Sequence, residues 1–221
     1  MNTYKVILLD LDGTLSDPKE GITKSVQYAL QRLHVHVQSL DELESFIGPP
    51  LQVSFAEKYK FHTEEIEKAI TFYRERFKEK GMYENELYEA IPSLLQQLKE
   101  EGYTLVVATS KPTIFAEKIL KYFQIDEYFD FVVGSNLDGT RAAKGEIISY
   151  ILHTYKEYKK SSFLMIGDRK HDIIGANEND IDSIGVTYGY GSYEELKESR
   201  PTYIVNHVME IKDIILAGKV K

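Results

Sequence analysis

The sequence predicts an α/β protein with a doubly wound parallel sheet and a small helical subdomain inserted after the first strand. Three observations predict this fold class. Short apolar runs alternate with helical segments over the second half of the chain, and a long helical stretch separates the first apolar run from the next one. Polar and acidic side chains directly follow several of the apolar runs, as at the ligand-binding edge of a parallel sheet.

The strands are predicted from short apolar runs bounded by turn residues. Val6–Leu9 is continuously apolar, which is typical of a strand that is buried on both faces. From Pro92 onward each further run is separated from the next by a helical segment, and this alternation is typical of a parallel sheet with helices on both faces. The predicted strands are residues 4–10, 103–108, 131–134, 163–167, 183–187 and 203–205.

The segment between the first two strands reads as helix throughout. Ser39, with Glu42 three residues later, resembles a capping box that opens a short helix. Thr63 is the predicted cap of a further helix, and Gly81 is the predicted C′ residue that ends it.

This helical segment sets the predicted domain boundaries. A crossover between parallel strands needs only about a dozen residues, far fewer than the segment contains. We therefore expect residues 16–85 to form a helical cap that selects the substrate. Residues 1–15 and 86–221 are expected to form the α/β core.

Composition narrows the possible partners and location. The 221 residues carry a formal net charge of -8 and no basic stripe, which argues against a nucleic-acid surface. No apolar run approaches the length of a membrane span, and the first residues contain no signal segment. We expect a soluble, cytoplasmic protein without a membrane or nucleic-acid partner, whereas the oligomeric state cannot be read from the sequence.

Acidic residues cluster at the predicted strand ends. Asp10 and Asp12 follow the first strand, Thr109 follows the second, and Asp168 and Asp172 follow the strand at 163–167. The carboxyl ends of parallel strands meet at one edge of a sheet, so these side chains are expected to lie together. Several carboxylates in one place resist joint ionisation unless a cation holds them. The sequence therefore predicts a Mg²⁺ site beside a nucleophilic carboxylate.

Four segments, in this order along the chain, resemble the motifs of the haloacid dehalogenase superfamily. They are Asp10–Leu15 (DLDGTL), Ala108–Pro112, Lys144 and Gly167–Asp172. With the helical insertion after the first strand, the whole chain resembles the phosphoglycolate-phosphatase-like branch. Dehalogenases lack the second acid of the first motif, so Asp12 favours phosphoryl transfer.

The resemblance implies a role for each motif residue. Asp10 would be the nucleophile, and Asp12 the general acid and base. Asp168 and Asp172 would bind Mg²⁺ together with the Asp10 carboxylate and the Asp12 main-chain carbonyl. Thr109 would donate a hydrogen bond to a phosphoryl oxygen.

The family pattern assigns the stabilising lysine to Lys144, with Lys111 as the rival candidate. Contacts with the substrate are expected from Gly13, Thr14 and Ser110 in the motifs, and from Gly48 in the cap. Arg74 and Arg76 could reach a substrate carboxylate, or could lie on a solvated helix face; the sequence favours the second interpretation.

The leading hypothesis is a Mg²⁺-dependent phosphatase that acts on small phosphorylated metabolites. A phosphomutase would use the same site residues and is the alternative. A phospho-acceptor domain of the response-regulator kind is a third, non-enzymatic interpretation, but its acceptor aspartate typically follows the third strand. Phosphoglycolate, nucleoside monophosphates and sugar phosphates all remain open as substrates.

Overall fold

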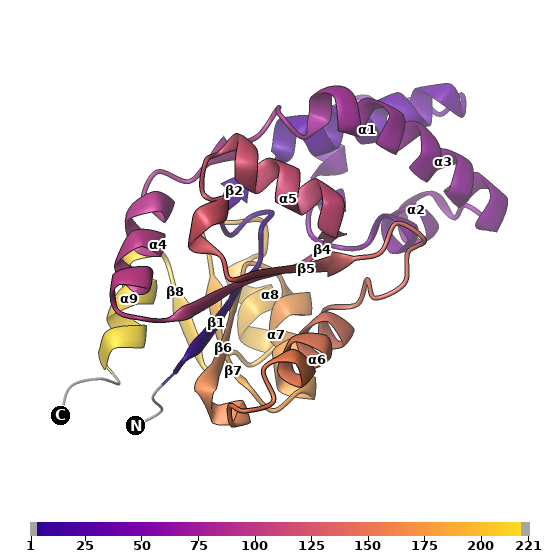
Figure 1. Cartoon of the computed structure of the whole chain (residues 1–221). Coiled ribbons are helices and arrows are strands. Elements are labelled where there is room, and N and C mark those ends of the chain that lie inside the picture. The colour runs from indigo at the N-terminus through magenta and orange to yellow at the C-terminus, as the bar shows by residue number, and fades with distance from the viewer. Residues whose placement is uncertain (1–3, 218–221) are drawn as a thin grey trace. The chain divides into compact units, whose positions relative to one another are not determined.

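The computed structural model describes residues 4–217, which divide into two compact units (Figure 1). Within the described residues, unit 1 contains residues 4–16 and 87–217, and unit 2 contains residues 17–86. The sequence analysis expected the corresponding boundaries after residues 15 and 85. No helix within the described part of the chain combines the length and the apolar character that crossing a membrane requires.

Unit 1 is built on a six-stranded sheet in the order β5-β4-β1-β6-β7-β8, in which the paired strands run parallel. The predicted fold class is therefore confirmed. Its strands are β1 (Val6–Leu9), β4 (Thr104–Pro112), β5 (Phe131–Ser135), β6 (Phe163–Gly167), β7 (Asp182–Val186) and β8 (Tyr203–Val205).

Helices cover both faces of this sheet. From β1 the chain moves outward through β4 to β5, then crosses to β6 and moves outward again through β7 to β8. Because crossovers between parallel strands are right-handed, the crossover helices before this reversal and those after it lie on opposite faces of the sheet (Figure 1). The first face carries α4 (Ile91–Glu100), α5 (Thr113–Tyr122) and α9 (Val208–Ala217), and the second carries α6 (Lys144–Thr154), α7 (Lys170–Glu178) and α8 (Tyr193–Glu198).

The hydrophobic core between the sheet and α6 and α7 fixes the central strands. Full burial of one aliphatic side chain stabilises the fold by about 1.5–3 kcal/mol, and all of these side chains are at least nine-tenths buried. The cluster comprises Val6, Leu8, Val106, Ala108, Val133, Ile147, Ile148, Ile151, Phe163, Met165, Ala176 and Ile181.

The register of the central strands brings their carboxyl ends together. Leu9 pairs with both Val107 and Ile166, so β4 and β6 reach the same edge of the sheet as β1. One expectation was wrong in detail: Thr109 lies within β4 and not after it. The reason is a register shift after Ala108 that lets β4 continue to pair with β5.

Unit 2 is helical, as the sequence predicts. Its elements are α1 (Lys19–Arg32), a 3₁₀ helix (Leu40–Phe46), α2 (Leu51–Tyr59), α3 (Thr63–Arg76) and a π-helical turn (Phe77–Gly81).

Three local expectations in unit 2 were wrong or incomplete. The sequence analysis did not predict α2, which directly follows Pro50. Ser39 accepts a hydrogen bond from the Asp41 N–H and not from Glu42, so the predicted capping box is not formed. Thr63 is the first residue of α3 and not its cap. Instead, the residue before Thr63, His62, donates its main-chain N–H to the Glu65 carboxylate.

Gly81 has a different role from the predicted one. It is not among the residues with positive φ, because the chain continues there in the π-helical turn. A Cβ atom on Gly21 of α1 would lie only 1.9 Å from the Gly81 carbonyl oxygen. The two glycines are therefore required by the close approach of two backbones.

The chain leaves and re-enters unit 1 at adjacent points. The short strands β2 (Ser16–Asp17) and β3 (Glu86–Leu87) pair with each other. Within unit 1, the Tyr88 N–H donates a hydrogen bond of 3.2 Å to the Leu15 carbonyl. This geometry is that of an insertion between two neighbouring backbone positions.

Candidate active site

Three carboxylates meet at the carboxyl edge of the sheet. Asp10 follows β1, Asp168 follows β6, and Asp172 is the third residue of α7. Their exposed fractions are 3%, 0% and 1%, and one oxygen of each lies within 4.8 Å of the others. The structure thus brings together side chains from distant parts of the chain that the sequence analysis assigned to one metal site.

The backbone around Asp168 holds this carboxylate in place. The Tyr190 N–H donates to Asp168 Oδ2 at 2.7 Å, and Thr14 Oγ1 lies 3.4 Å from Asp168 Oδ1. Gly13 has a φ of +85°, and a Cβ atom there would lie 2.2 Å from Asp168 Oδ2. Gly13 is therefore required both by its left-handed conformation and by the space that the carboxylate occupies.

Lys144, at the start of α6, is the cation of this cluster. Its Nζ lies 2.9 Å from Asp10 Oδ1 and 2.7 Å from Asp172 Oδ1, and it also donates to the Ala108 carbonyl at 2.8 Å. One ammonium cannot balance three carboxylates. The cluster therefore keeps an excess of negative charge in a buried place.

The pKa values of the cluster reflect that excess. Burial raises the pKa of Asp168 well above its ordinary value, and repulsion from Asp172 and Asp10 adds to the effect. Burial also raises the pKa of Asp172 to about 6, although Lys144 opposes the shift. Burial disfavours the charged form of Lys144, but Asp10 and Asp172 outweigh it and hold its pKa above the ordinary value.

The three carboxylates fit a magnesium ion. Mg²⁺ prefers oxygen ligands and is usually held by one or two carboxylates, waters and a substrate phosphate. The cluster offers oxygen atoms alone, already grouped and fixed by backbone contacts. The carboxylate of Asp12, the fourth predicted metal residue, is not part of the cluster, so Asp12 could contribute only its main-chain carbonyl, as the sequence analysis proposed.

The Asp12 carboxylate is instead paired with Lys111. The Lys111 Nζ lies 2.8 Å from Asp12 oxygens, and the two residues are only 9% and 6% exposed. Burial raises the pKa of Asp12, whereas Lys111 opposes the shift. The sequence analysis treated Lys111 as a rival of Lys144. The structure places both lysines at the site, on different carboxylates.

The remaining predicted site residues fall into two groups. Thr109 is buried, and its Oγ1 accepts a hydrogen bond from the Lys111 N–H; Ser110 is half-buried beside it in β4. Thr14 is fully buried. Gly48 belongs to unit 2, where its φ is +104°, so it is not part of the carboxylate cluster. Its expected substrate contact stays a prediction.

Sequence reasoning missed the contribution of the segment after β7. Besides the Tyr190 N–H, this segment supplies the Tyr188 hydroxyl, which donates to the Thr14 carbonyl at 3.0 Å. The motifs that identify the other site residues do not include this segment. Its contacts involve main-chain groups, which no residue pattern identifies directly.

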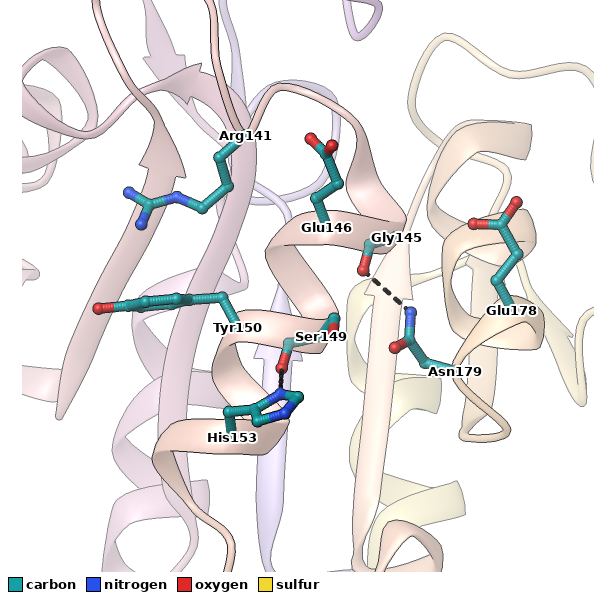
Figure 2. A pocket seen from close by; sticks show the side chains of 8 residues that line it. All are labelled: Arg141, Gly145, Glu146, Ser149, Tyr150, His153, Glu178 and Asn179. Atoms are coloured by element: carbon teal, nitrogen blue, oxygen red, sulfur yellow. Dashed lines mark hydrogen bonds between the residues drawn. The ribbon is translucent and has the colours of Figure 1, made fainter.

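A separate pocket of about 580 Å³ lies over α6 and the end of α7 (Figure 2). The Arg141 guanidinium lies 4.6 Å from the centre of the Tyr150 ring, and Asn179 donates to the Gly145 carbonyl. No predicted catalytic residue lines this pocket, so it is not part of the candidate site. Its lining residues are Arg141, Gly145, Glu146, Ser149, Tyr150, His153, Glu178 and Asn179.

Comparison with known proteins shows the family to which the chain belongs. Residues 7–186 match the family described as haloacid dehalogenase-like hydrolase. The chain is 46% identical over 212 residues to a 5'-nucleotidase of Pseudomonas aeruginosa, with 96% of each chain covered. It is 32% identical to the tyrosine-protein kinase PtkA of Mycobacterium tuberculosis, covering 95% of this chain and 71% of that protein.

A solved structure is also similar to this chain in fold. The crystal structure of a predicted phosphatase from Clostridium acetobutylicum superposes with a TM-score of 0.94 at 50% identity, covering 97% of this chain and 99% of that one. The family resemblance is confirmed. The chain belongs to the haloacid dehalogenase-like hydrolase family.

Proposed function

We propose that the protein hydrolyses small phosphomonoesters with the help of Mg²⁺, through an aspartyl-phosphate formed on Asp10. The observation that carries this proposal is the buried cluster of three carboxylates with Lys144 against Asp10. Asp10 combines a position fixed by the sheet with a neighbouring cation, as in-line attack on phosphorus by a carboxylate requires.

In the first step, a carboxylate oxygen of Asp10 attacks phosphorus and the bond from phosphorus to the ester oxygen breaks. Asp12 gives its proton to that oxygen, so the product leaves as a neutral alcohol. The raised pKa of Asp12, caused by burial, supports its proposed role as a proton carrier.

In the second step, Asp12 takes a proton from a water molecule whose oxygen attacks phosphorus. The bond between phosphorus and Asp10 breaks, inorganic phosphate leaves, and both aspartates return to their starting states. Lys144 and Thr109 would stabilise the charge on the phosphoryl oxygens.

Asp10, Asp168 and Asp172, with the Asp12 carbonyl, are the residues that would hold Mg²⁺. When bound, the ion supplies positive charge that offsets the phosphoryl oxygens and the crowded carboxylates.

Unit 2 is proposed to select the substrate, with Gly48 as one contact. We rank nucleoside monophosphates first among the candidate substrates, because one relative is named 5'-nucleotidase. Phosphoglycolate and sugar phosphates follow.

A panel of phosphorylated metabolites, assayed for inorganic phosphate with and without Mg²⁺, tests the proposal. We expect release from at least one phosphomonoester, loss of release in EDTA, and recovery when Mg²⁺ is restored. Turnover that persists in EDTA would contradict the proposed metal site, and no turnover of any ester would contradict the phosphatase assignment.

A phosphomutase remains the second candidate, because it would use the same carboxylates. The acceptor of the phosphoryl group distinguishes the reactions: water gives inorganic phosphate, whereas a sugar hydroxyl gives an isomerised sugar phosphate. A tyrosine-containing peptide belongs in the same assay, since one relative is named a tyrosine-protein kinase.

A further inference from the structure

Two arginines flank the buried face of α3 in unit 2. Ile70 and Tyr73 of α3 and Phe77, directly after it, recur at helical spacing and are buried. Arg74 and Arg76 lie on opposite sides of this stripe, and both side chains are half-buried.

On the Arg76 side, protein groups accept the hydrogen bonds of the guanidinium. Its two terminal nitrogens donate to the two oxygens of Glu84 at 2.8 and 2.9 Å, and one of them also lies 3.2 Å from Ser25 Oγ. This is the bidentate arrangement that a guanidinium prefers. Arg76 is therefore a structural residue, and the suggestion that it binds a substrate carboxylate is not supported.

The Arg74 side has no such partner. Within residues 4–217, the Arg74 guanidinium makes no hydrogen bond and no ion pair. The other half-buried arginines of the described chain all have acceptors: Arg76 has Glu84, Arg141 has the Gly134 carbonyl, and Arg169 has Glu195. Among the half-buried arginines of the described residues, Arg74 alone lacks an acceptor for its guanidinium.

An unpaired cation beside an apolar helix face is energetically unfavourable, because it loses hydration without gaining a counter-charge. Burial lowers the pKa of Arg74 accordingly. A protein tolerates such a group where a ligand supplies the missing anion.

We propose that Arg74 is an anion-binding residue of unit 2, and that its counter-ion is the carboxylate or phosphate group of a small ligand. The planar fork of the guanidinium matches either oxyanion with two parallel hydrogen bonds. The ligand could be a substrate with a second anionic group, in which case the inference depends on the proposed function. It could also be a separate metabolite with the same chemistry.

Thermal unfolding of the intact protein in EDTA, titrated with malonate and separately with inorganic phosphate, tests the anion site directly. We expect at least one anion to raise Tm, with a midpoint concentration about tenfold higher in Arg74→Gln and partly restored in Arg74→Lys. The matched control is Lys78→Gln, which removes a positive charge from an exposed position just beyond α3 and should titrate like wild type. If neither titration depends on Arg74, the inference is wrong.

Steady-state kinetics then identify the source of the anion. Phosphoglycolate carries a carboxylate besides its phosphate, whereas p-nitrophenyl phosphate does not. A KM increase at least tenfold larger for phosphoglycolate in Arg74→Gln would identify the substrate as the source. Unchanged KM values for both esters, combined with lost anion binding, would identify a separate ligand, whereas an equal increase for both would point to the phosphate that the two esters share. If wild type hydrolyses neither ester nor any other of the panel, the proposed function fails, while the unfolding titrations still decide the role of Arg74.

Discussion

At the scale of single residues, two buried lysines form ion pairs with different carboxylates. Lys144 lies between Asp10 and Asp172, whereas Lys111 lies against Asp12. The first arrangement places a cation beside the proposed nucleophile and a proposed metal ligand, and the second places one beside the proposed proton carrier.

Replacement of Lys144 tests this division. Lys144→Met should lower kcat/KM by about 10²-fold or more, because the cation proposed to stabilise the transferring phosphoryl group is lost. It should also destabilise the metal-free protein by about 3–5 kcal/mol, since two buried carboxylates lose their cation. Urea unfolding in EDTA measures the second effect. Lys118→Met, at an exposed position of α5, is the control, and an equal response of the two variants would be inconsistent with this role for Lys144.

The raised pKa of Asp172 predicts a pH dependence of stability. Its pKa is about 6 in the folded chain against an ordinary value of 3.8, so between these values the folded state binds more protons than the unfolded state. The metal-free protein should therefore lose stability as the pH rises from about 4 to 6, by on the order of 1–3 kcal/mol from this group. Asp172→Asn should flatten the dependence in chemical unfolding, and an unchanged slope would show that Asp172 does not titrate there.

Sequence reasoning identified the acidic cluster for a physical reason. The position of an aspartate that follows a buried parallel strand is largely fixed, because register and pleat determine where the strand ends. The partner of Asp12 could not be found in this way. Lys111 reaches that carboxylate because β4 continues past Ala108, and no residue pattern revealed this extension.

At the scale of elements, the strands were the easiest to predict, since a fully buried strand has a continuous apolar run. Helix α2 was missed because only Ser54 and Phe55 within it are buried, which leaves almost no apolar periodicity to detect. Gly81 was misread because a glycine near a helix end usually indicates a left-handed residue, whereas here it allows close backbone packing.

The contact between Gly21 and Gly81 predicts a large effect of a small substitution. Gly21→Ala should destabilise unit 2 by about 1–3 kcal/mol or more, because the new methyl group would overlap the Gly81 carbonyl. Gly185→Ala is the comparison, since its nearest neighbour is the flexible Leu196 side chain at 3.2 Å. Urea unfolding should rank Gly21→Ala as clearly the less stable variant, and the reverse ranking would refute the packing argument.

At the scale of the whole molecule, the helical unit is an insertion between neighbouring points of the core. The Leu15–Tyr88 hydrogen bond keeps those points together within unit 1. We predict that unit 1 still folds when residues 17–86 are replaced by a short Gly-Ser linker, with its far-ultraviolet circular dichroism and a cooperative unfolding transition retained. Activity toward different phosphomonoesters should become less selective. A deletion protein that folds but keeps the substrate ranking of the full chain would show that unit 2 does not select substrates.

The central claim is that Asp10 becomes covalently phosphorylated during turnover. Acid quenching of the enzyme with Mg²⁺ and a substrate identified in the panel, followed by peptide mass spectrometry, measures this directly. The account predicts a phosphoryl group on the peptide that contains Asp10, absent in EDTA and absent in Asp10→Asn, which should also be inactive. Full turnover by Asp10→Asn, or a phosphoryl group found on another residue, would contradict it.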